Sequence, residues 1–227
     1  MSQRVGVILS GCGVLDGSEI HEAVATLVAL DSHGLEAVCL APDIEQMHVV
    51  NHLSGQVMEG EKRNVLVEAA RIARGRVSPL TAESVKDLAA LILPGGFGAV
   101  KNLSDYAVSG VDMQVNGEVR AALQEVHRAG KPIAALCISP VILARIFGKE
   151  SPRLTVGAEG ADAENLEEMG ACHQVTEHEQ VVVDERLNLI TGPCYMLEST
   201  IGQIFRGAEA VVARLAGLLQ EVRCQSG

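Results

Sequence analysis

An α/β fold, in which helices cover both faces of a mostly parallel sheet, is predicted by two features of the sequence. Short apolar runs of strand length alternate with longer segments whose apolar residues recur about every 3.6 positions, the period of a helix. Hydrophobic residues make up 48% of the 227 residues, which is enough to bury a large core. No linker rich in Pro, Gly or Ser divides the chain, so we expect one domain over residues 1–227.

The apolar runs and helical segments predict the elements in chain order. Strands are expected over Val5–Ser10, Ala37–Ala41, Leu88–Leu93, Pro132–Leu136, Leu154–Gly157, Val181–Asp184 and Leu187–Thr191. Helices are expected over Ser18–Ser32, Arg63–Arg74, Glu118–Ala129, Pro140–Phe147 and Leu197–Val222. Because only Glu185–Arg186 separates the last two strands, we expect them to form an antiparallel hairpin at an edge of the sheet.

The balance of charges excludes several classes of partner. The chain carries 18 Lys and Arg against 29 Asp and Glu, a formal net charge of −11, and only 2% aromatic residues. A nucleic-acid partner requires basic residues and stacking rings, and anionic membrane surfaces also attract basic proteins. No apolar run approaches the ~18 residues of a membrane-spanning helix. We therefore expect a cytoplasmic protein that binds neither nucleic acid nor membranes.

Cys137 is the strongest candidate for a reactive side chain. None of the six cysteines lies in a Cys-x-x-Cys pair, so a disulfide framework is not indicated. Cys137 follows the strand Pro132–Leu136 and precedes a helix, at the edge of the sheet where α/β proteins bind ligands. The N–H groups of a helix N-terminus favour the thiolate by lowering its pKa, and the Ile138 amide is placed to stabilise an oxyanion. The alternative is an inert, buried cysteine.

Two further segments are expected to meet Cys137 at this edge. The turn Leu93–Gly98 contains three glycines, which let backbone N–H groups approach a ligand closely. Glu19 and Glu22 begin a helix and are three residues apart, so they share one of its faces. A desolvated Glu22 would have a raised pKa and could exchange protons with the thiol. The alternative is that both acids complement the helix dipole and face water.

Patterns that suggest a cofactor or a metal are incomplete. After the first strand, Gly11 and Gly13 begin a loop of the dinucleotide-binding type, but Asp16 stands where its third glycine belongs. His48 and His52 have the spacing of a zinc-binding helix without its glutamate. We therefore expect no cofactor and no metal.

Cys12 and the polar segment Lys101–Met113 have more than one interpretation. Cys12 also follows a strand, so it can approach Cys137, and the two thiols could then form a redox pair. Lys101–Met113 shows no helical period and lies beside the glycine turn, so we expect a loop that acts as a lid or a dimer contact.

Several motifs along the chain are similar to those of a known family. They are Gly-Val-Ile-Leu-Ser-Gly-Cys-Gly-Val-Leu-Asp-Gly-Ser-Glu-Ile-His-Glu from Gly6, Arg-Asn-Val-Leu-Val-Glu-Ala-Ala-Arg-Ile from Arg63, Pro-Gly-Gly-Phe-Gly-Ala from Pro94, Lys-Asn-Leu-Ser from Lys101, Cys-Ile-Ser-Pro from Cys137 and Leu-Glu-Glu-Met-Gly-Ala from Leu166. With these motifs the chain resembles the ThiJ/PfpI superfamily, and within it the ElbB-like glyoxalases. The resemblance implies a flavodoxin-like, three-layer αβα sandwich, the class I glutamine amidotransferase-like fold, with a nucleophile elbow at Cys137.

The resemblance also implies roles for particular residues. Cys137 is expected to be the nucleophile, with Glu22 as the acid beside it and Glu19 as the second choice. Gly96 and Ile138 are expected to supply the oxyanion amides. Further residues expected to line the site are Cys12, Gly95, Phe97, His173 and Pro193. Because the superfamily commonly dimerises, the resemblance implies a homodimer.

One departure from the superfamily narrows the expected activity. Many relatives have His directly after the cysteine, where this chain has Ile138, and His173 is a candidate replacement in space. The departure argues against a peptidase or a glutaminase activity. We expect a cofactor-independent glyoxalase that converts glyoxal, or another small dicarbonyl, to glycolate through a Cys137 hemithioacetal. The resemblance links it to isoprenoid (lycopene) biosynthesis. The alternatives are a thiol-based redox sensor that uses Cys137 and, less favoured, a glutaminase-type subunit.

Overall fold

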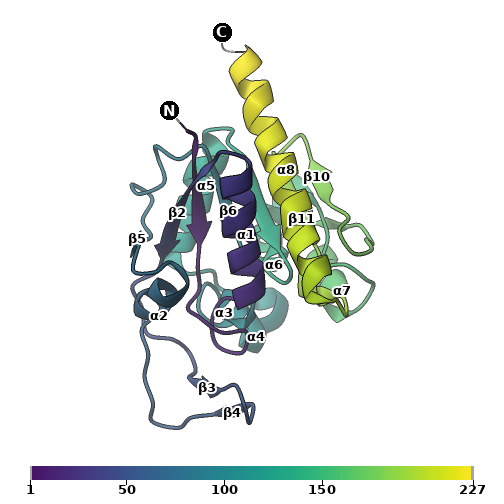
Figure 1. The fold of residues 1–227 in the computed structure, drawn as a ribbon. Coiled ribbons are helices and arrows are strands. Elements are labelled where there is room, and N and C mark those ends of the chain that lie inside the picture. Colours follow the sequence, from purple (N-terminus) through teal and green to yellow (C-terminus); the bar gives the residue numbers. More distant parts are fainter. Residues whose placement is uncertain (1, 226–227) are drawn as a thin grey trace.

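A seven-stranded sheet forms the centre of the computed structural model, which describes residues 2–225 (Figure 1). Its strand order is β10-β11-β7-β6-β1-β2-β5, and every neighbouring pair is parallel except β10 and β11. The strands are Arg4–Ile8 (β1), Glu36–Ala41 (β2), Val77–Pro79 (β5), Ala90–Leu93 (β6), Ile133–Leu136 (β7), Val182–Asp184 (β10) and Leu189–Gly192 (β11). The predicted α/β fold with a mostly parallel sheet is confirmed.

Helices cover both faces of this sheet. One face carries Ile20–Ser32 (α1), Val65–Ile72 (α2) and Ile201–Gln225 (α8). The other carries Gly117–Arg128 (α5), Pro140–Phe147 (α6) and Ala161–Glu168 (α7), with the short helices Phe97–Lys101 (α3) and Tyr106–Ser109 (α4). In Figure 1, α1 and α8 pack side by side in front of the sheet, while α5 and α6 lie behind it. No helix within residues 2–225 is both long and apolar enough to cross a membrane.

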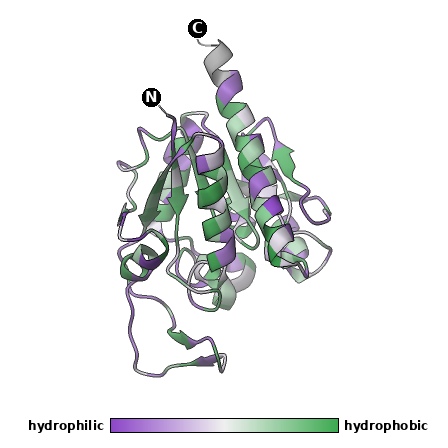
Figure 2. Ribbon diagram, viewed as in Figure 1, coloured by the Kyte–Doolittle hydropathy of each residue, from purple (hydrophilic) through white to green (hydrophobic). Residues whose placement is uncertain are grey.

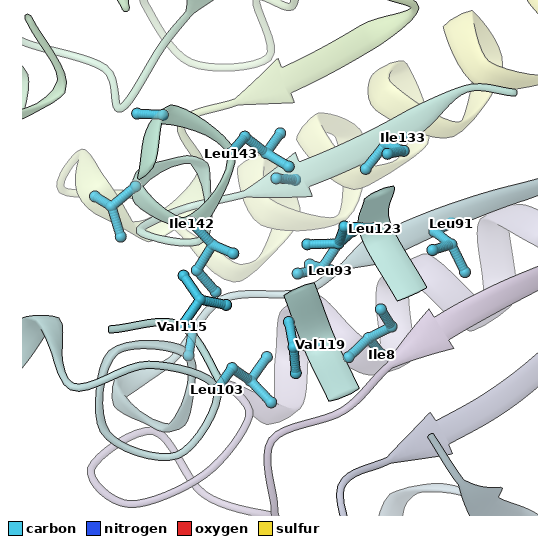
Figure 3. Packing of buried hydrophobic residues seen from close by; sticks show 14 of the residues in the cluster. Ile8, Leu91, Leu93, Leu103, Val115, Val119, Leu123, Ile133, Ile142 and Leu143 are labelled. Carbon is cyan, nitrogen blue, oxygen red and sulfur yellow. The ribbon is translucent and has the colours of Figure 1, made fainter. Parts of the chain in front are cut away.

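Two hydrophobic cores lie on opposite faces of the sheet because successive side chains of a strand point to opposite sides. In β6, Leu91 and Leu93 belong to the core beneath α5 and α6, whereas Ala90 and Ile92 belong to the core beneath α1 and α8. Figure 3 shows the first of these cores, and Figure 2 shows hydrophobic residues concentrated on the strands. Burial on both faces explains why these strands are continuous apolar runs in the sequence.

The hairpin at the sheet edge is confirmed with a longer turn than predicted. β10 pairs with β11 in antiparallel fashion and has no neighbour on its other side within the described sheet. The connection runs over residues 185–188 rather than Glu185–Arg186 alone, and Asn188 adopts a left-handed conformation with φ of 53°. Asp184 holds the turn, since its Oδ1 accepts from the N–H groups of Arg186 and Leu187 at 3.1 and 3.2 Å.

Several elements differ from the prediction. The expected strand Leu154–Gly157 is wrong for the main sheet, because Arg153–Leu154 (β8) pairs instead with Cys172–His173 (β9) in a separate two-stranded sheet. The segment Lys101–Met113 is more than a loop, since α4 and a 3₁₀ turn lie within it. The edge strand β5, the helix α7 and the hairpin Val50–Asn51 (β3) with Gln56–Val57 (β4) were not predicted. All of these are short or rich in polar residues, so they lack a clear apolar period.

Close packing at Gly148, where α6 ends, provides a test of the fold. A Cβ atom there would overlap the carbonyl oxygen of Met169, so Gly148→Ala should lower the free energy of unfolding by about 2 kcal/mol or more. Gly117 begins α5 with no atom within 4 Å of an added Cβ, and Gly117→Ala should be neutral or stabilising by about 0.5 kcal/mol. Urea unfolding followed by circular dichroism measures both, and equal stabilities would contradict the packing.

Candidate active site

Cys137 lies in a tight turn between β7 and α6, with a φ of 58° that non-glycine residues rarely adopt. Its N–H donates to the carbonyl of Gly192 at the end of β11, at 2.9 Å. The hydroxyl of the buried Ser139 donates to the carbonyl of Pro94 after β6, at 2.8 Å. The strained turn is therefore fastened to both neighbouring strands, which is the expected geometry of a nucleophile elbow.

Glu22 lies in the first turn of α1 and is fully buried. Its Oε2 accepts from the N–H of Gly95 at 2.8 Å, and its Oε1 accepts from the N–H of Tyr195 at 3.2 Å. The carboxyl lies close enough to the Cys137 thiol for each group to shift the pKa of the other. Glu19 has a different task, because its Oε2 accepts from the N–H of Glu22 at 2.7 Å and so caps the helix. Glu22, and not Glu19, is the acid that contacts the thiol.

The protonation of this pair follows from its burial. Burial raises the pKa of Glu22 to about 7, although the N–H groups of Tyr195 and Gly95 oppose the shift. Burial, and then the nearby Glu22 carboxylate, raise the pKa of the Cys137 thiol well above its ordinary value. The expected lowering of the thiol pKa is wrong, because these two effects outweigh the N–H groups around the sulfur. The thiolate therefore forms when Glu22 accepts the thiol proton.

The backbone around Gly95 and Gly96 fits closely over this pair. A Cβ atom on Gly95 would lie 2.6 Å from Glu22 Oε2 and 2.8 Å from Cys137 Sγ, so the position leaves no room for a side chain. Gly96 has a φ of 96°, and its N–H lies close enough to the Cys137 sulfur to oppose the rise of the thiol pKa. The Ile138 N–H has no hydrogen-bond partner within residues 2–225. Two N–H groups are thus available near the sulfur for an oxyanion.

A cavity of about 430 Å³ opens over the Cys137 thiol. Its lining combines apolar side chains, two tyrosines and two carboxylates. The lining residues are Val14, Glu19, Gly96, Phe97, Val100, Tyr106, Ala107, Cys137, Ile138, Asp162, Tyr195 and Met196. The expected site residues Glu19, Gly96, Phe97 and Ile138 therefore meet Cys137 in one place.

Of the five further residues expected to line the site, only Phe97 lines this cavity, which corrects the prediction. Gly95 lies instead against the side chains of Glu22 and Cys137. Cys12 lies nearer α2, where Glu68 and Arg71 influence its thiol, so no Cys12–Cys137 redox pair is indicated. His173 lies in β9, beside the carboxylates of Glu159 and Glu167. Pro193 is buried against the turn at Gly157. In each case the side chain packs against residues outside the cavity lining.

The opposite wall of the cavity was not predicted. Tyr106 of α4 donates its hydroxyl proton to Asp162 Oδ1 at 2.6 Å, and Asn165 Nδ2 donates to the same hydroxyl at 2.8 Å. Burial and the Asp162 carboxylate raise the pKa of Tyr106 to about 12. The one available signal was that Tyr106 falls in the predicted lid segment. No three His, Cys, Asp or Glu side chains of the described chain are grouped so that they could hold a metal ion.

Comparison with known proteins assigns the family. No family model matches the chain. Over 224 residues, 95% of this chain and 83% of the relative, it is 46% identical to the human "Glutamine amidotransferase-like class 1 domain-containing protein 3, mitochondrial". Rat and zebrafish relatives are named ES1 proteins. The chain belongs to this ES1 family of glutamine amidotransferase-like class 1 proteins.

Solved structures agree with this assignment. The chain matches an isoprenoid biosynthesis protein with an amidotransferase-like domain from Ehrlichia chaffeensis, with a TM-score of 0.89, 33% identity and coverage of 96% of this chain and 100% of that one. It also shares its fold with Drosophila melanogaster DJ-1beta, with a TM-score of 0.56, 20% identity and coverage of 98% and 96%. The predicted class I glutamine amidotransferase-like fold is confirmed, and the narrower ElbB-like assignment stays a prediction.

The ES1 relatives overturn one expectation. The human, rat and zebrafish proteins are all named as mitochondrial, which contradicts the expected cytoplasmic location. The physical reason is that net charge and hydropathy control solubility, which proteins of both compartments share, and do not encode the compartment itself.

The raised pKa of Glu22 predicts a pH dependence of stability. Because the folded state binds this proton more tightly than the unfolded state, Glu22 costs stability as the pH rises from about 4.5 to about 7. The parent should therefore lose about 2 to 3 kcal/mol relative to Glu22→Gln between pH 5 and pH 8. Denaturant unfolding of both proteins at each pH measures this difference. The exposed Glu118→Gln is the control, and a similar shift there would contradict the assignment.

Proposed function

We propose that the protein is a cofactor-independent glyoxalase-like enzyme that converts a small dicarbonyl to a 2-hydroxy acid. The observation that carries the proposal is the close approach of the buried Glu22 carboxyl to the Cys137 thiol, both of which lie against the backbone of Gly95. A carboxyl with a pKa of about 7 is suited to both accept and return protons near neutral pH.

The residues support the following course for glyoxal. Glu22 accepts the thiol proton while Cys137 Sγ bonds to one aldehyde carbon, and the proton then passes to the new oxygen to give a hemithioacetal. The N–H groups of Gly96 and Ile138 stabilise the developing oxyanion. Glu22 next removes the hydrogen of this carbon and returns it to the neighbouring carbonyl carbon. Water hydrolyses the resulting thioester, which releases glycolate and restores the thiol.

The alternatives receive less support from the site. Glutaminase or peptidase chemistry needs a base of the Cys-His type, and no histidine lines the cavity within the described chain. A redox sensor needs an accessible thiolate, whereas the Cys137 side chain is only 7% exposed and its pKa is raised. Cys–Glu chemistry on a carbonyl is therefore the favoured proposal.

Two wider predictions accompany the proposal. The likeness to a structure named as an isoprenoid biosynthesis protein supports a link with that metabolism. The homodimer also stays a prediction. An apolar row on the exposed side of α1, formed by Ile20, Val24 and Val28, supports it, because exposed apolar rows are common at subunit contacts.

Glycolate production from glyoxal by the purified protein tests the function. Cys137→Ala should abolish turnover, because it removes the nucleophile that bonds to the substrate. Glu22→Gln should lower kcat by about 100-fold or more, because it removes the group that transfers the protons. Cys12→Ala is the matched control, since this thiol lies outside the cavity, and it should retain full activity. An inactive parent, or an active and folded Cys137→Ala variant, would refute the enzymatic proposal.

A further inference from the structure

We infer that the site selects an uncharged 2-oxoaldehyde that bears an apolar substituent, in preference to glyoxal and to anionic carbonyl compounds. The inference rests on the proposed function and concerns the size and charge of its substrate. It follows from three properties of the cavity over Cys137: its volume, its apolar wall and its carboxylates.

The volume of the cavity exceeds what glyoxal needs. At about 430 Å³ it falls in the range of pockets that hold drug-sized ligands, whereas glyoxal is two linked formyl groups without a substituent. Cys137 and the oxyanion donors Gly96 and Ile138 are only three of its twelve lining residues. The remaining space is therefore available for a substituent attached to the second carbonyl carbon.

The wall around that space is largely apolar. Val14, Phe97, Val100, Ile138 and Met196 line it from four separate segments of the chain. Phe97 is 47% exposed and Val14 is 39% exposed, so the cavity lining includes apolar surface that water covers. Covering these side chains with an apolar substituent would remove this surface from water and so stabilise the bound state.

The charges of the cavity exclude anionic substrates. Glu19 and Asp162 both line it, and no Lys, Arg or His is among the lining residues of the described chain. Lys101 lies 5.2 Å from the ring centroid of the lining residue Phe97, and its ammonium group donates to the Leu15 carbonyl at 2.9 Å. A substrate carboxylate would therefore meet like charges without a partner. The same repulsion favours release of the hydroxy-acid product, which forms as an anion.

The reaction balances without a cofactor. In R–CO–CHO the thiol adds to the aldehyde to give a hemithioacetal. Glu22 then transfers the hydrogen of that carbon to the ketone carbon, while the hydroxyl proton of the hemithioacetal passes to the ketone oxygen. The aldehyde carbon is thereby oxidised to a Cys137 thioester while the ketone carbon is reduced to an alcohol. Water cleaves the thioester, so that R–CH(OH)–COO⁻ leaves and the thiol is restored. The apolar group R takes no part in bond changes and serves only to bind, which supplies the remote binding energy that glyoxal lacks.

Three probes separate size from charge. Phenylglyoxal is apolar and neutral, 4-carboxyphenylglyoxal has nearly the same size with a negative charge, and glyoxal has no substituent. We expect kcat/KM for phenylglyoxal to exceed that for each of the other two by about tenfold or more. The initial rate of mandelate, carboxymandelate or glycolate formation, separated by chromatography, measures each reaction.

A pair of neighbouring variants on α4 tests where the substituent binds. Ala107 lines the cavity, whereas Val108 is 73% exposed and does not. Ala107→Phe should lower kcat/KM for phenylglyoxal about tenfold more than for glyoxal, because the added ring occupies the apolar space. Val108→Phe should leave the ratio of the two substrates unchanged. Asp162→Asn should raise the relative kcat/KM of the carboxylated probe, because it removes one of the two repelling charges.

The outcomes distinguish this inference from the function on which it rests. Turnover of glyoxal as fast as phenylglyoxal, or an Ala107→Phe variant that behaves like Val108→Phe, would overturn the substrate class and leave the glyoxalase proposal standing. Failure of all three probes to react would refute the proposed function and the inference together. A preference for phenylglyoxal that Ala107→Phe removes would support both.

Discussion

The close approach of the buried Glu22 carboxyl to the Cys137 thiol is the constraint on which the site depends. It requires the first turn of α1 and the elbow after β7 to meet at one point beneath the backbone of Gly95. That meeting is possible because β1, β6 and β7 are neighbours in the sheet and all end at the same edge. Gly95 must lack a side chain for the same reason, since its Cβ would displace the two reacting groups.

The burial of Glu22 and Cys137 also determines which protonation states the site can adopt. In a site with little water, neither the carboxyl nor the thiol ionises easily, so one proton is retained by the pair and can move between them. The ES1 chain therefore has the elbow of an amidotransferase-like fold, but its cysteine is paired with a glutamate rather than a histidine. A shared fold does not determine the reaction. The side chains and N–H groups around the sulfur determine it.

Local patterns in the sequence account for most of the sheet and for the position of Cys137. Strands buried on both faces are apolar runs, and the residues that follow them fall at the ligand-binding edge, which is how Cys137 could be predicted. Glu22 was singled out by the resemblance to a known family and not by a local pattern. The thiol pKa could not be predicted, because its direction depends on how completely the group is buried and on a carboxylate that is 115 positions away in the sequence. The edge strand β5 was missed because Val77–Pro79 is short and its face is partly polar.

The sequence by itself determined the alternation of strands and helices, the two apolar faces of the sheet and the position of Cys137 in a strand-to-helix turn. These features depend on periodicity and on neighbours within a few residues. Only the tertiary structure decided which side chains face the thiol. It placed Tyr106 against Asp162 across 56 positions of sequence and turned Cys12 and His173 to other surroundings. The convergence of side chains on one cavity depends on how distant elements pack, and no local pattern of residues encodes that packing.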